Sequence, residues 1–159
     1  MVQRLDYMKL APKLAQKLTE LTLAVKGGGL DEKLLILVEI RASQINGCAF
    51  CLDLHVKDAK IHGERELRLH HVAIWHESPL FDLREKAALG WTEVLTRLAP
   101  GGVPPEAFDE LRLHFTEKEI AELTYMVMAI NAWNRLAIAF TPVPGSADLS
   151  LRLDKAGLA

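Results

Sequence analysis

Two cysteines and one histidine stand close together in the sequence and could carry redox chemistry. Cys48 and Cys51 are three positions apart, and His55 follows Cys51 by four. On a helix this spacing places the three side chains along one face, so the two sulfurs can come within bonding distance. Asn46 and Gly47 precede the pair, which indicates that the cysteines lie at or near a helix N-terminus. The positive end of the helix dipole there lowers the pKa of a thiol and favours the thiolate.

These residues are the parts that a thiol peroxidase needs. A thiolate attacks the O–O bond of a peroxide, and a second thiol condenses with the resulting sulfenic acid. An external dithiol must then reduce the disulfide. His55 is the candidate proton relay, and along a helix axis it lies about 6 Å beyond Cys51 but about 10 Å beyond Cys48. The spacing therefore predicts Cys51 as the attacking thiol and Cys48 as the resolving thiol.

Two other interpretations of the cysteine pair stay open. A buried free cysteine is a good small apolar side chain, so the pair could be structural. Thiolates and imidazole also suit zinc, but the sequence offers no obvious fourth ligand. We predict neither a metal nor a cofactor. The remaining histidines show no ligand spacing and are expected at the surface or at interfaces: His62, His70, His71, His76 and His114.

Two charges interrupt an otherwise apolar segment. Residues 34–45 are apolar almost all round a helix, so Glu39 and Arg41 are expected in or beside the core, where each needs a partner. One interpretation makes Glu39 a carboxylate that orients His55 or relays protons to it, with Arg41 holding that carboxylate. The other makes the two charges a structural ion pair or a contact between subunits.

The elements that must position these residues are all helices. Apolar spacings of three and four, capping residues and Gly or Pro breaks predict helices over about 10–25, 31–45, 48–62, 64–76, 82–99, 105–113 and 116–140. No segment alternates as a β-strand does, so the predicted class is all-α. Residues 30–46 also resemble residues 115–131 at an offset of 85, which is either a two-fold pseudo-repeat or chance. Trp75, Trp91 and Trp133 occupy apolar helical positions and are expected in the core.

Composition limits the classes of function. The 159 residues suit a single domain over 1–159, with its core over about 30–140 and a loosely structured tail over 142–159. The net charge of −2 is scattered, so no binding of nucleic acid or of an anionic membrane is expected. No apolar run approaches the roughly 20 residues that cross a bilayer, and the first ten residues do not resemble a signal peptide. We therefore expect a cytoplasmic protein, in which a close cysteine pair is more often redox-active than a permanent crosslink.

The segment from Glu39 to His55 resembles the alkylhydroperoxidase AhpD-like branch of the carboxymuconolactone decarboxylase superfamily. Phrases that begin at Trp75, Ala88 and Ile130 extend the resemblance over about residues 30–140. It implies a helical bundle of about six to eight helices, homo-oligomers (trimers or hexamers) and peroxidase activity without metal or prosthetic group. It also implies a hydroperoxide substrate and a dithiol reductant protein, lipoyl- or thioredoxin-like.

Carried over residue by residue, the resemblance makes Cys51 the peroxide-attacking thiol, Cys48 the resolving thiol that faces the reductant, and His55 the proton relay. Two departures concern the relay. The best-studied branch has a histidine between the cysteines, where this chain has Ala49-Phe50. It also places its relay glutamate at the position of Ile36, so that Glu39 is the candidate substitute here.

Other functions stay open at this level. The decarboxylase branch lacks this cysteine pair, which argues against lactone chemistry. The alternatives are a general dithiol oxidoreductase, a decarboxylase-like enzyme acting on a small organic acid, or a non-catalytic, redox-responsive helical oligomer. Oligomer formation is also expected because the predicted helices carry more apolar surface than one chain of this size buries.

Overall fold

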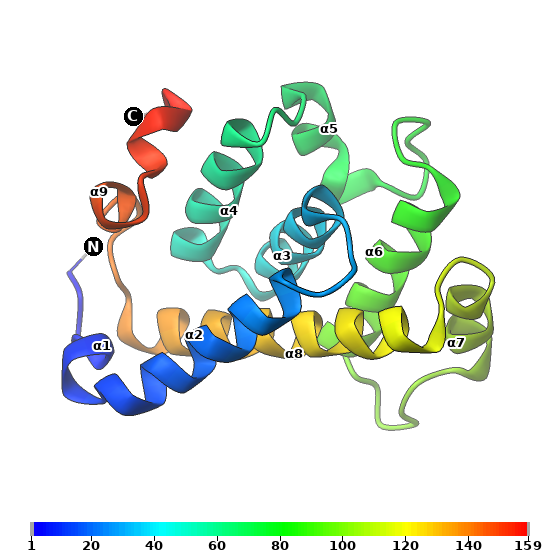
Figure 1. The fold of residues 1–159 in the computed structure, drawn as a ribbon, viewed down its shortest axis with the longest axis horizontal. Coiled ribbons are helices and arrows are strands. Elements are labelled where there is room, and N and C mark those ends of the chain that lie inside the picture. The colour runs from blue at the N-terminus through cyan, green and yellow to red at the C-terminus, as the bar shows by residue number, and fades with distance from the viewer. Residues whose placement is uncertain (1, 159) are drawn as a thin grey trace.

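The computed structural model describes residues 2–158, and this part of the chain is helical without strands (Figure 1). Its helices are α1 (Tyr7–Leu10), α2 (Pro12–Lys26), α3 (Glu32–Asn46), α4 (Ala49–Ile61), α5 (Glu66–His71), α6 (Leu83–Thr96), α7 (Pro105–Arg112), α8 (Glu117–Phe140) and α9 (Asp148–Leu151), with the 3-10 helices η1 (Val72–Ile74) and η2 (Leu153–Ala156). The predicted all-α class is confirmed. The helices outnumber the expected six to eight because α1 and α9 are single turns of four residues, too short to show periodicity. Within residues 2–158, no helix combines the length and the apolar character needed to cross a membrane.

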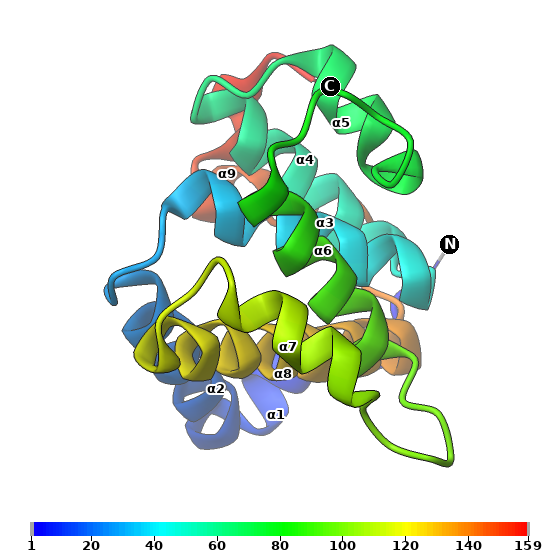
Figure 2. The same ribbon diagram turned by 90° about the vertical axis from the view of Figure 1, so that its right-hand side faces the viewer.

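Helix α3 lies at the centre of the fold and packs against α4, α6 and α8. Figures 1 and 2 show α2 and α8 on one side of it and α4 and α5 on the other. Leu35 and Val38 belong to a core cluster shared with α6 and α8, whereas Leu37 and Ile40 belong to a second cluster shared with α4 and α5. This enclosure explains why the segment is apolar all round, and it buries Glu39 and Arg41 as predicted.

Three predicted helix starts are confirmed by their caps. The Asp31 side chain accepts a hydrogen bond from the Leu34 amide at the start of α3. Capping boxes open α6 at Asp82 and α8 at Thr116. Gly47 has a left-handed φ of 69°, which ends α3 and lets a new helix begin one residue later. The first cysteine, Cys48, is therefore the N-cap of α4.

Two predicted ranges differ from the structure. The helix expected over 64–76 is divided into α5 and the 3-10 turn η1, where the buried side chains of Val72 and Trp75 enter the core. The helix expected over 82–99 ends at Thr96. In both cases the chain leaves helical geometry before the Pro or Gly that marks the break in the sequence.

The expectation of a loosely structured tail is wrong for residues 148–156. Helix α9 and η2 form there, and η2 packs against α4 with Leu153 buried. The buried Lys57 ammonium of α4 lies 2.7 Å from Asp148 and 2.9 Å from Asp53. The Gly145 amide also donates to Asp53 at 2.9 Å. The contacts of Asp148 and Gly145 join residues about ninety positions apart, which no local pattern of the tail reveals.

The two similar segments, 30–46 and 115–131, lie side by side as parts of α3 and α8. The Asn46 side chain donates a hydrogen bond of 3.0 Å to Asn131, its counterpart 85 positions later. Beyond these residues the segments diverge, because α3 stops at Gly47 while α8 continues to Phe140. The helix–break–helix unit is therefore not repeated, and a common origin of the segments stays a prediction.

Candidate active site

The cysteine pair lies at the N-terminus of α4, as predicted. Cys48 is the N-cap residue, and its Sγ accepts a hydrogen bond of 3.3 Å from the Cys51 amide. The Cα atoms are 5.4 Å apart and the sulfurs are joined in a disulfide. Both side chains are buried, with exposed fractions of 2% and 4%. The left-handed turn at Gly47 and the helical spacing therefore bring the sulfurs together.

His55 lies one turn further along α4 and meets Glu39 of α3. Its Nδ1 is 3.4 Å from Glu39 Oε2, and both side chains are buried. Neither of these two atoms has a hydrogen bond of good geometry. The structure thus brings together Cys48, Cys51, His55 and Glu39, the four residues singled out in the sequence.

Lys26, at the end of α2, belongs to the same cluster and was missed by sequence reasoning. Its Nζ lies 3.0 Å from Glu39 Oε2 and 3.5 Å from Asp58 Oδ2. Burial lowers the pKa of Lys26, but attraction to these two carboxylates outweighs burial and the pKa is raised overall. In the sequence Lys26 is one of several lysines in an amphipathic helix. Only the need of a buried Glu39 for a cation could have pointed toward it.

The idea that Arg41 holds Glu39 is wrong. Arg41 Nε and Nη2 lie 2.8 Å and 2.7 Å from Glu93 Oε1 of α6. Residues two positions apart on a helix point about 200° apart, so Glu39 and Arg41 face opposite sides of α3. Arg41 is therefore half of a structural ion pair, but its partner is Glu93.

The surroundings of His55 favour its neutral form. Burial lowers its pKa and Lys26 lowers it further, whereas the nearby Glu39 and Asp58 carboxylates oppose these effects without reversing them. A neutral imidazole can accept a proton at neutral pH. His55 can therefore act as a base toward a thiol one turn away.

Glu39, His55 and Asp58 also form a group of potential metal ligands, with ligand atoms within 4.8 Å of one another. The Lys26 ammonium already lies within ion-pair distance of both carboxylates. A metal ion would have to displace this ammonium or repel it at close range. The donor set therefore fits the lysine that is present better than it fits a metal ion.

A cavity of about 390 Å³ opens beside the cluster. Cys51, His55, Glu39 and Lys26 line it, and Cys48 does not. Its walls come from α1, α2, α3, α4, α8 and α9 and are mostly apolar, with Met8, Leu23, Phe50, Leu54, Trp133 and Leu151 among them. The cavity is large enough for a small organic molecule beside the Cys51 side chain.

The three tryptophans differ in their placement. Trp75 and Trp91 are buried in the core as predicted. Trp133 instead forms a wall of the cavity, where its Nε1 donates a hydrogen bond of 3.1 Å to Thr22. Helical spacing could not distinguish a tryptophan in the core from one in the cavity wall, because both positions lie among apolar side chains.

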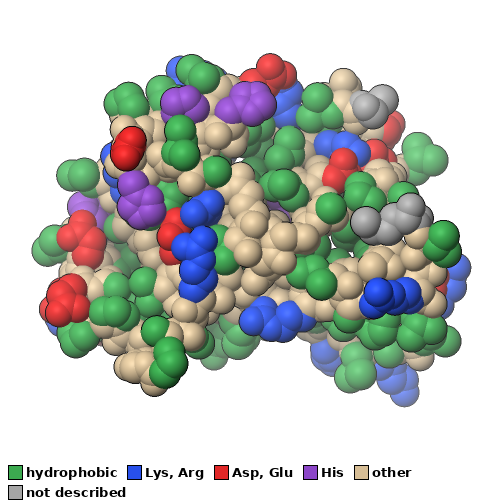
Figure 3. Space-filling model, turned by 180° about the vertical axis from the view of Figure 1, so that it is seen from behind, with side chains coloured by type: hydrophobic (Ala, Val, Ile, Leu, Met, Phe, Trp, Pro, Cys, Tyr) green, Lys and Arg blue, Asp and Glu red, His purple; other side chains and the backbone are tan. Residues whose placement is uncertain are grey.

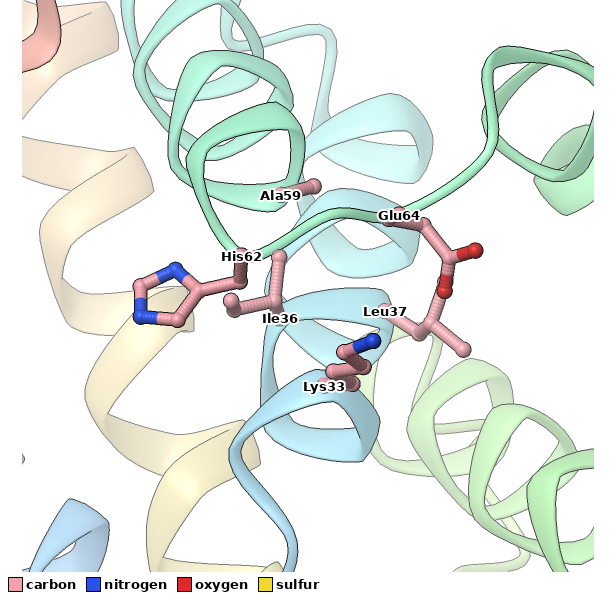
Figure 4. A pocket seen from close by; sticks show the side chains of 6 residues that line it. All are labelled: Lys33, Ile36, Leu37, Ala59, His62 and Glu64. Carbon is pink, nitrogen blue, oxygen red and sulfur yellow. The ribbon is translucent and has the colours of Figure 1, made fainter. Parts of the chain in front are cut away.

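A second hollow lies between α3, the end of α4 and the residues that follow it (Figure 4). It has about 0 Å³ of space for a water molecule, so it is not a ligand site. Ile36 lines this hollow, one turn before Glu39. The position at which the best-studied branch carries its relay glutamate is therefore apolar here, and Glu39 is the carboxylate that meets His55.

The other histidines are partly or fully exposed: His62, His70, His71, His76 and His114. Figure 3 shows histidines gathered toward one side of the back face, among scattered apolar and charged side chains. His62 lies 3.3 Å from both Asp58 and Glu32. Across residues 2–158 these histidines form no group of metal ligands.

Comparison with known proteins identifies similar chains. Residues 12–94, just over half of the chain, match the model of the carboxymuconolactone decarboxylase family. The uncharacterised protein YdfG of Bacillus subtilis is 35% identical over 139 residues, which cover 87% of this chain and 95% of YdfG. Among solved structures, a protein of unknown function from Agrobacterium tumefaciens, for which an AhpD role in antioxidant defence has been suggested, aligns with a TM-score of 0.87. It is 38% identical, and the alignment covers 90% of this chain and 98% of that one.

The debrominase Bmp8 has the same fold at greater distance. It aligns with a TM-score of 0.78 and 20% identity, covering 94% of this chain and 80% of its own. At this identity the likeness extends to the fold alone. One helical scaffold therefore serves more than one kind of chemistry, and the activity of this chain has to be argued from its own site.

Proposed function

The chain belongs to the carboxymuconolactone decarboxylase family, and on this premise we propose that it is a thiol peroxidase that reduces hydroperoxides through a Cys48–Cys51 disulfide cycle. The observation that carries the proposal is the cavity at the cysteine pair. Cys51 lines it together with His55, whereas its disulfide partner Cys48 does not line it. A substrate in the cavity therefore meets one thiol and one neutral base first.

The reaction follows from these positions. His55 accepts the Cys51 proton, and the thiolate attacks the peroxide oxygen that carries the hydrogen. The O–O bond breaks, Cys51 becomes a sulfenic acid, and the departing alkoxide takes the proton from His55 to leave as an alcohol. The Cys48 thiol then attacks the Cys51 sulfur, which releases water and forms the disulfide. Two electrons from an external dithiol return both cysteines to thiols.

The roles of the two cysteines rest on opposing effects. Helix-terminus electrostatics act on both thiols and favour the N-cap residue Cys48 as thiolate. Access and proton transfer favour Cys51, which shares the cavity with His55. Because a thiol without access to peroxide cannot attack it, we assign Cys51 as attacker and Cys48 as resolver.

The partners in this proposal are a hydroperoxide and a dithiol reductant, lipoyl- or thioredoxin-like. Both sulfurs are buried, so a reductant must reach the disulfide through the cavity or after a local movement. A cytoplasmic location is part of the proposal, because the cycle needs a supply of reduced dithiols. A homo-oligomer, trimer or hexamer, is part of it too. Large apolar side chains that could form its interfaces are exposed, among them Leu10, Leu14, Leu67, Leu83 and Leu113.

The test is thiol titration after addition of one equivalent of cumene hydroperoxide to the reduced protein. We expect rapid loss of two thiols per peroxide. Cys48→Ser should yield a sulfenic acid on Cys51 that a dimedone-type reagent traps, whereas Cys51→Ser should react slowly. Trapping on Cys48 would exchange the roles. Thiols that survive the peroxide would rule out the peroxidase and favour a decarboxylase-like or binding role.

A further inference from the structure

We infer that Lys26 is a positioning residue of this site, whose ammonium supplies the positive charge that the buried Glu39 carboxylate needs and so leaves His55 uncharged. The inference deepens the proposed function and rests on it for its purpose, since an uncharged His55 is the base that accepts the Cys51 proton. Lys26 is not one of the residues expected from the cysteine motif. It comes from α2, which packs against α8 and lines the same cavity.

The first step of the argument is the burial of Glu39. Its exposed fraction is 2%, and an ionised carboxylate in such a place requires a nearby positive charge. Two groups lie within reach of Oε2, namely Lys26 Nζ at 3.0 Å and His55 Nδ1 at 3.4 Å. A positive charge on either group could neutralise the negative charge of the carboxylate, and one positive charge is enough.

The second step is the competition between the two cations. An ammonium has a reference pKa of 10.5 and an imidazole one of 6.5, so Lys26 holds its proton far more strongly. Lys26 also contacts Asp58, whose carboxylate strengthens its hold on the proton. With Lys26 in place, His55 gains little by charging, because the positive charge beside it opposes a second one.

The charged groups that act on His55 come from three elements. They are Lys26 of α2, Glu39 of α3 and Asp58 of its own helix. The other elements around the cavity contribute side chains without charge: Tyr7 of α1, Trp133 and Ala137 of α8, and Ala147, Ser150 and Leu151 of α9. Asp148 of α9 is paired with Lys57, and the charged side chains of η2, Asp154 and Lys155, are exposed.

Removal of the ammonium therefore changes the charge balance sharply. With His55 uncharged, the described cluster carries one positive and two negative charges. Without Lys26 two carboxylates remain, and His55 is the next group able to balance them. A protonated His55 has no free base to offer Cys51. Lys26 thus acts on the chemistry through Glu39 and His55, without touching the reacting sulfur.

The experiment measures the titration of His55 directly, in the disulfide form and without peroxide. The chemical shifts of the imidazole Cε1–H signals are followed by NMR as a function of pH. The signal of His55 is assigned as the one that is missing from the spectrum of His55→Gln. In Lys26→Met we expect the pKa of His55 to rise by about one pH unit or more. Lys26→Arg should keep the wild-type titration. Lys17→Met is the matched control, because Lys17 lies on the same helix, is exposed and, among residues 2–158, pairs with Glu20 alone.

A double variant distinguishes an electrostatic effect of Lys26 on the pKa of His55 from a purely structural contact between α2 and α3. In Lys26→Met combined with Glu39→Gln, the carboxylate that would draw a proton to His55 is gone, so the pKa of His55 should fall back. An unchanged titration in Lys26→Met, or a rise that persists in the double variant, would overturn the inference. If Lys26→Met does not fold, recovery of folding in the double variant supports the charge pairing. A double variant that stays unfolded contradicts it.

A second readout links the inference to the reaction. If Lys26 keeps His55 uncharged, the acidic limb of the pH profile for peroxide-dependent thiol loss should move upward in Lys26→Met. For a rise of about one pH unit, the rate should then fall by up to about tenfold at low pH, near pH 5, and recover near pH 9. A merely structural Lys26 would slow the reaction equally at both pH values. Absence of thiol loss in the wild type would remove the proposed function but leave the His55 titration as an independent result.

Discussion

Two glutamates, the buried Glu39 on one side of α3 and the half-buried Glu93 on the other, meet very different partners. Glu93 receives both Arg41 and the Trp75 Nε1–H on Oε1, at 2.7–2.8 Å, and Arg97 on Oε2 at 3.1 Å. Burial raises its pKa, but the hydrogen bonds from Trp75 and Arg41 outweigh burial and lower the pKa overall. Among the described residues, Glu39 lies within ion-pair distance of the Lys26 ammonium at 3.0 Å and of His55 at 3.4 Å alone, and its Oε2 has no hydrogen bond of good geometry.

The difference teaches how a structural carboxylate and a functional one can be told apart. A carboxylate held by several donors is locked in one protonation state and in one position. A carboxylate with few donors beside a cavity can still exchange interactions with a titrating neighbour. Glu93 fits the first description and Glu39 the second. The following predictions test this contrast, beginning with the largest effect.

The first prediction compares the two glutamates in the reaction. Glu39→Gln should slow peroxide-dependent thiol loss by about 100-fold, because the group that orients His55 is lost, whereas Glu93→Gln should stay within about twofold of the wild type. Stopped-flow measurement with a thiol-sensitive probe gives both rates. Equal slowing in the two variants would remove the functional distinction.

The second prediction is that Glu93→Gln destabilises the fold more than Glu39→Gln does. Glu93→Gln should lower the free energy of unfolding by about 2–3 kcal/mol, because the buried Arg41 guanidinium loses its counter-charge. Glu39→Gln should cost about 1 kcal/mol, since Lys26 keeps Asp58 as a partner. Urea denaturation of the disulfide form provides both values. A larger loss in Glu39→Gln would mean that Glu39 is the structural carboxylate.

The third prediction concerns the pH dependence of stability. The pKa of His55 is lowered in the folded protein, so below pH 6.5 the unfolded chain binds a proton that folded His55 does not. Stability should therefore decrease as pH falls below about 6.5, by up to about 1.4 kcal/mol per pH unit, until the folded pKa is reached. Above pH 6.5 this contribution should be complete and constant. His55→Gln should remove that part of the slope, and an unchanged slope would contradict the buried neutral imidazole.

The fourth prediction concerns helix α9, which lies beside the cavity that Glu39 lines. Helix α9 lines the cavity and is joined to α4 by Lys57 and Asp148. Asp148→Asn should weaken this attachment by up to about 1 kcal/mol and speed amide hydrogen exchange in residues 147–153, with the core of α3 unchanged. Asp154→Asn is the control, since Asp154 is exposed and forms no ion pair among the described residues. Unaltered exchange in Asp148→Asn would show that apolar packing alone holds the tail.

Much of the fold could be predicted from the sequence because its signals are local. The caps at Asp31, Asp82 and Thr116, and the break at Gly47, act within three or four residues. The one-turn spacing of Cys48, Cys51 and His55 is of the same kind, since helix geometry converts it directly into a shared face. The all-round apolar character of α3 likewise sufficed to predict that Glu39 and Arg41 are buried.

The partners of the buried charges were decided by tertiary structure. Arg41 pairs with Glu93 across 52 positions, and Lys57 pairs with Asp148 across 91. Lys26 likewise reaches Glu39 from another helix, and Trp133 becomes a cavity wall only where α2 and α8 meet. Such pairs depend on how helices pack, and ion-pair attraction works between any cation and carboxylate that packing brings within about 4 Å. The sequence determined that Glu39 and Arg41 are buried, and the packing of α2, α4 and α6 around α3 decided which charges they meet.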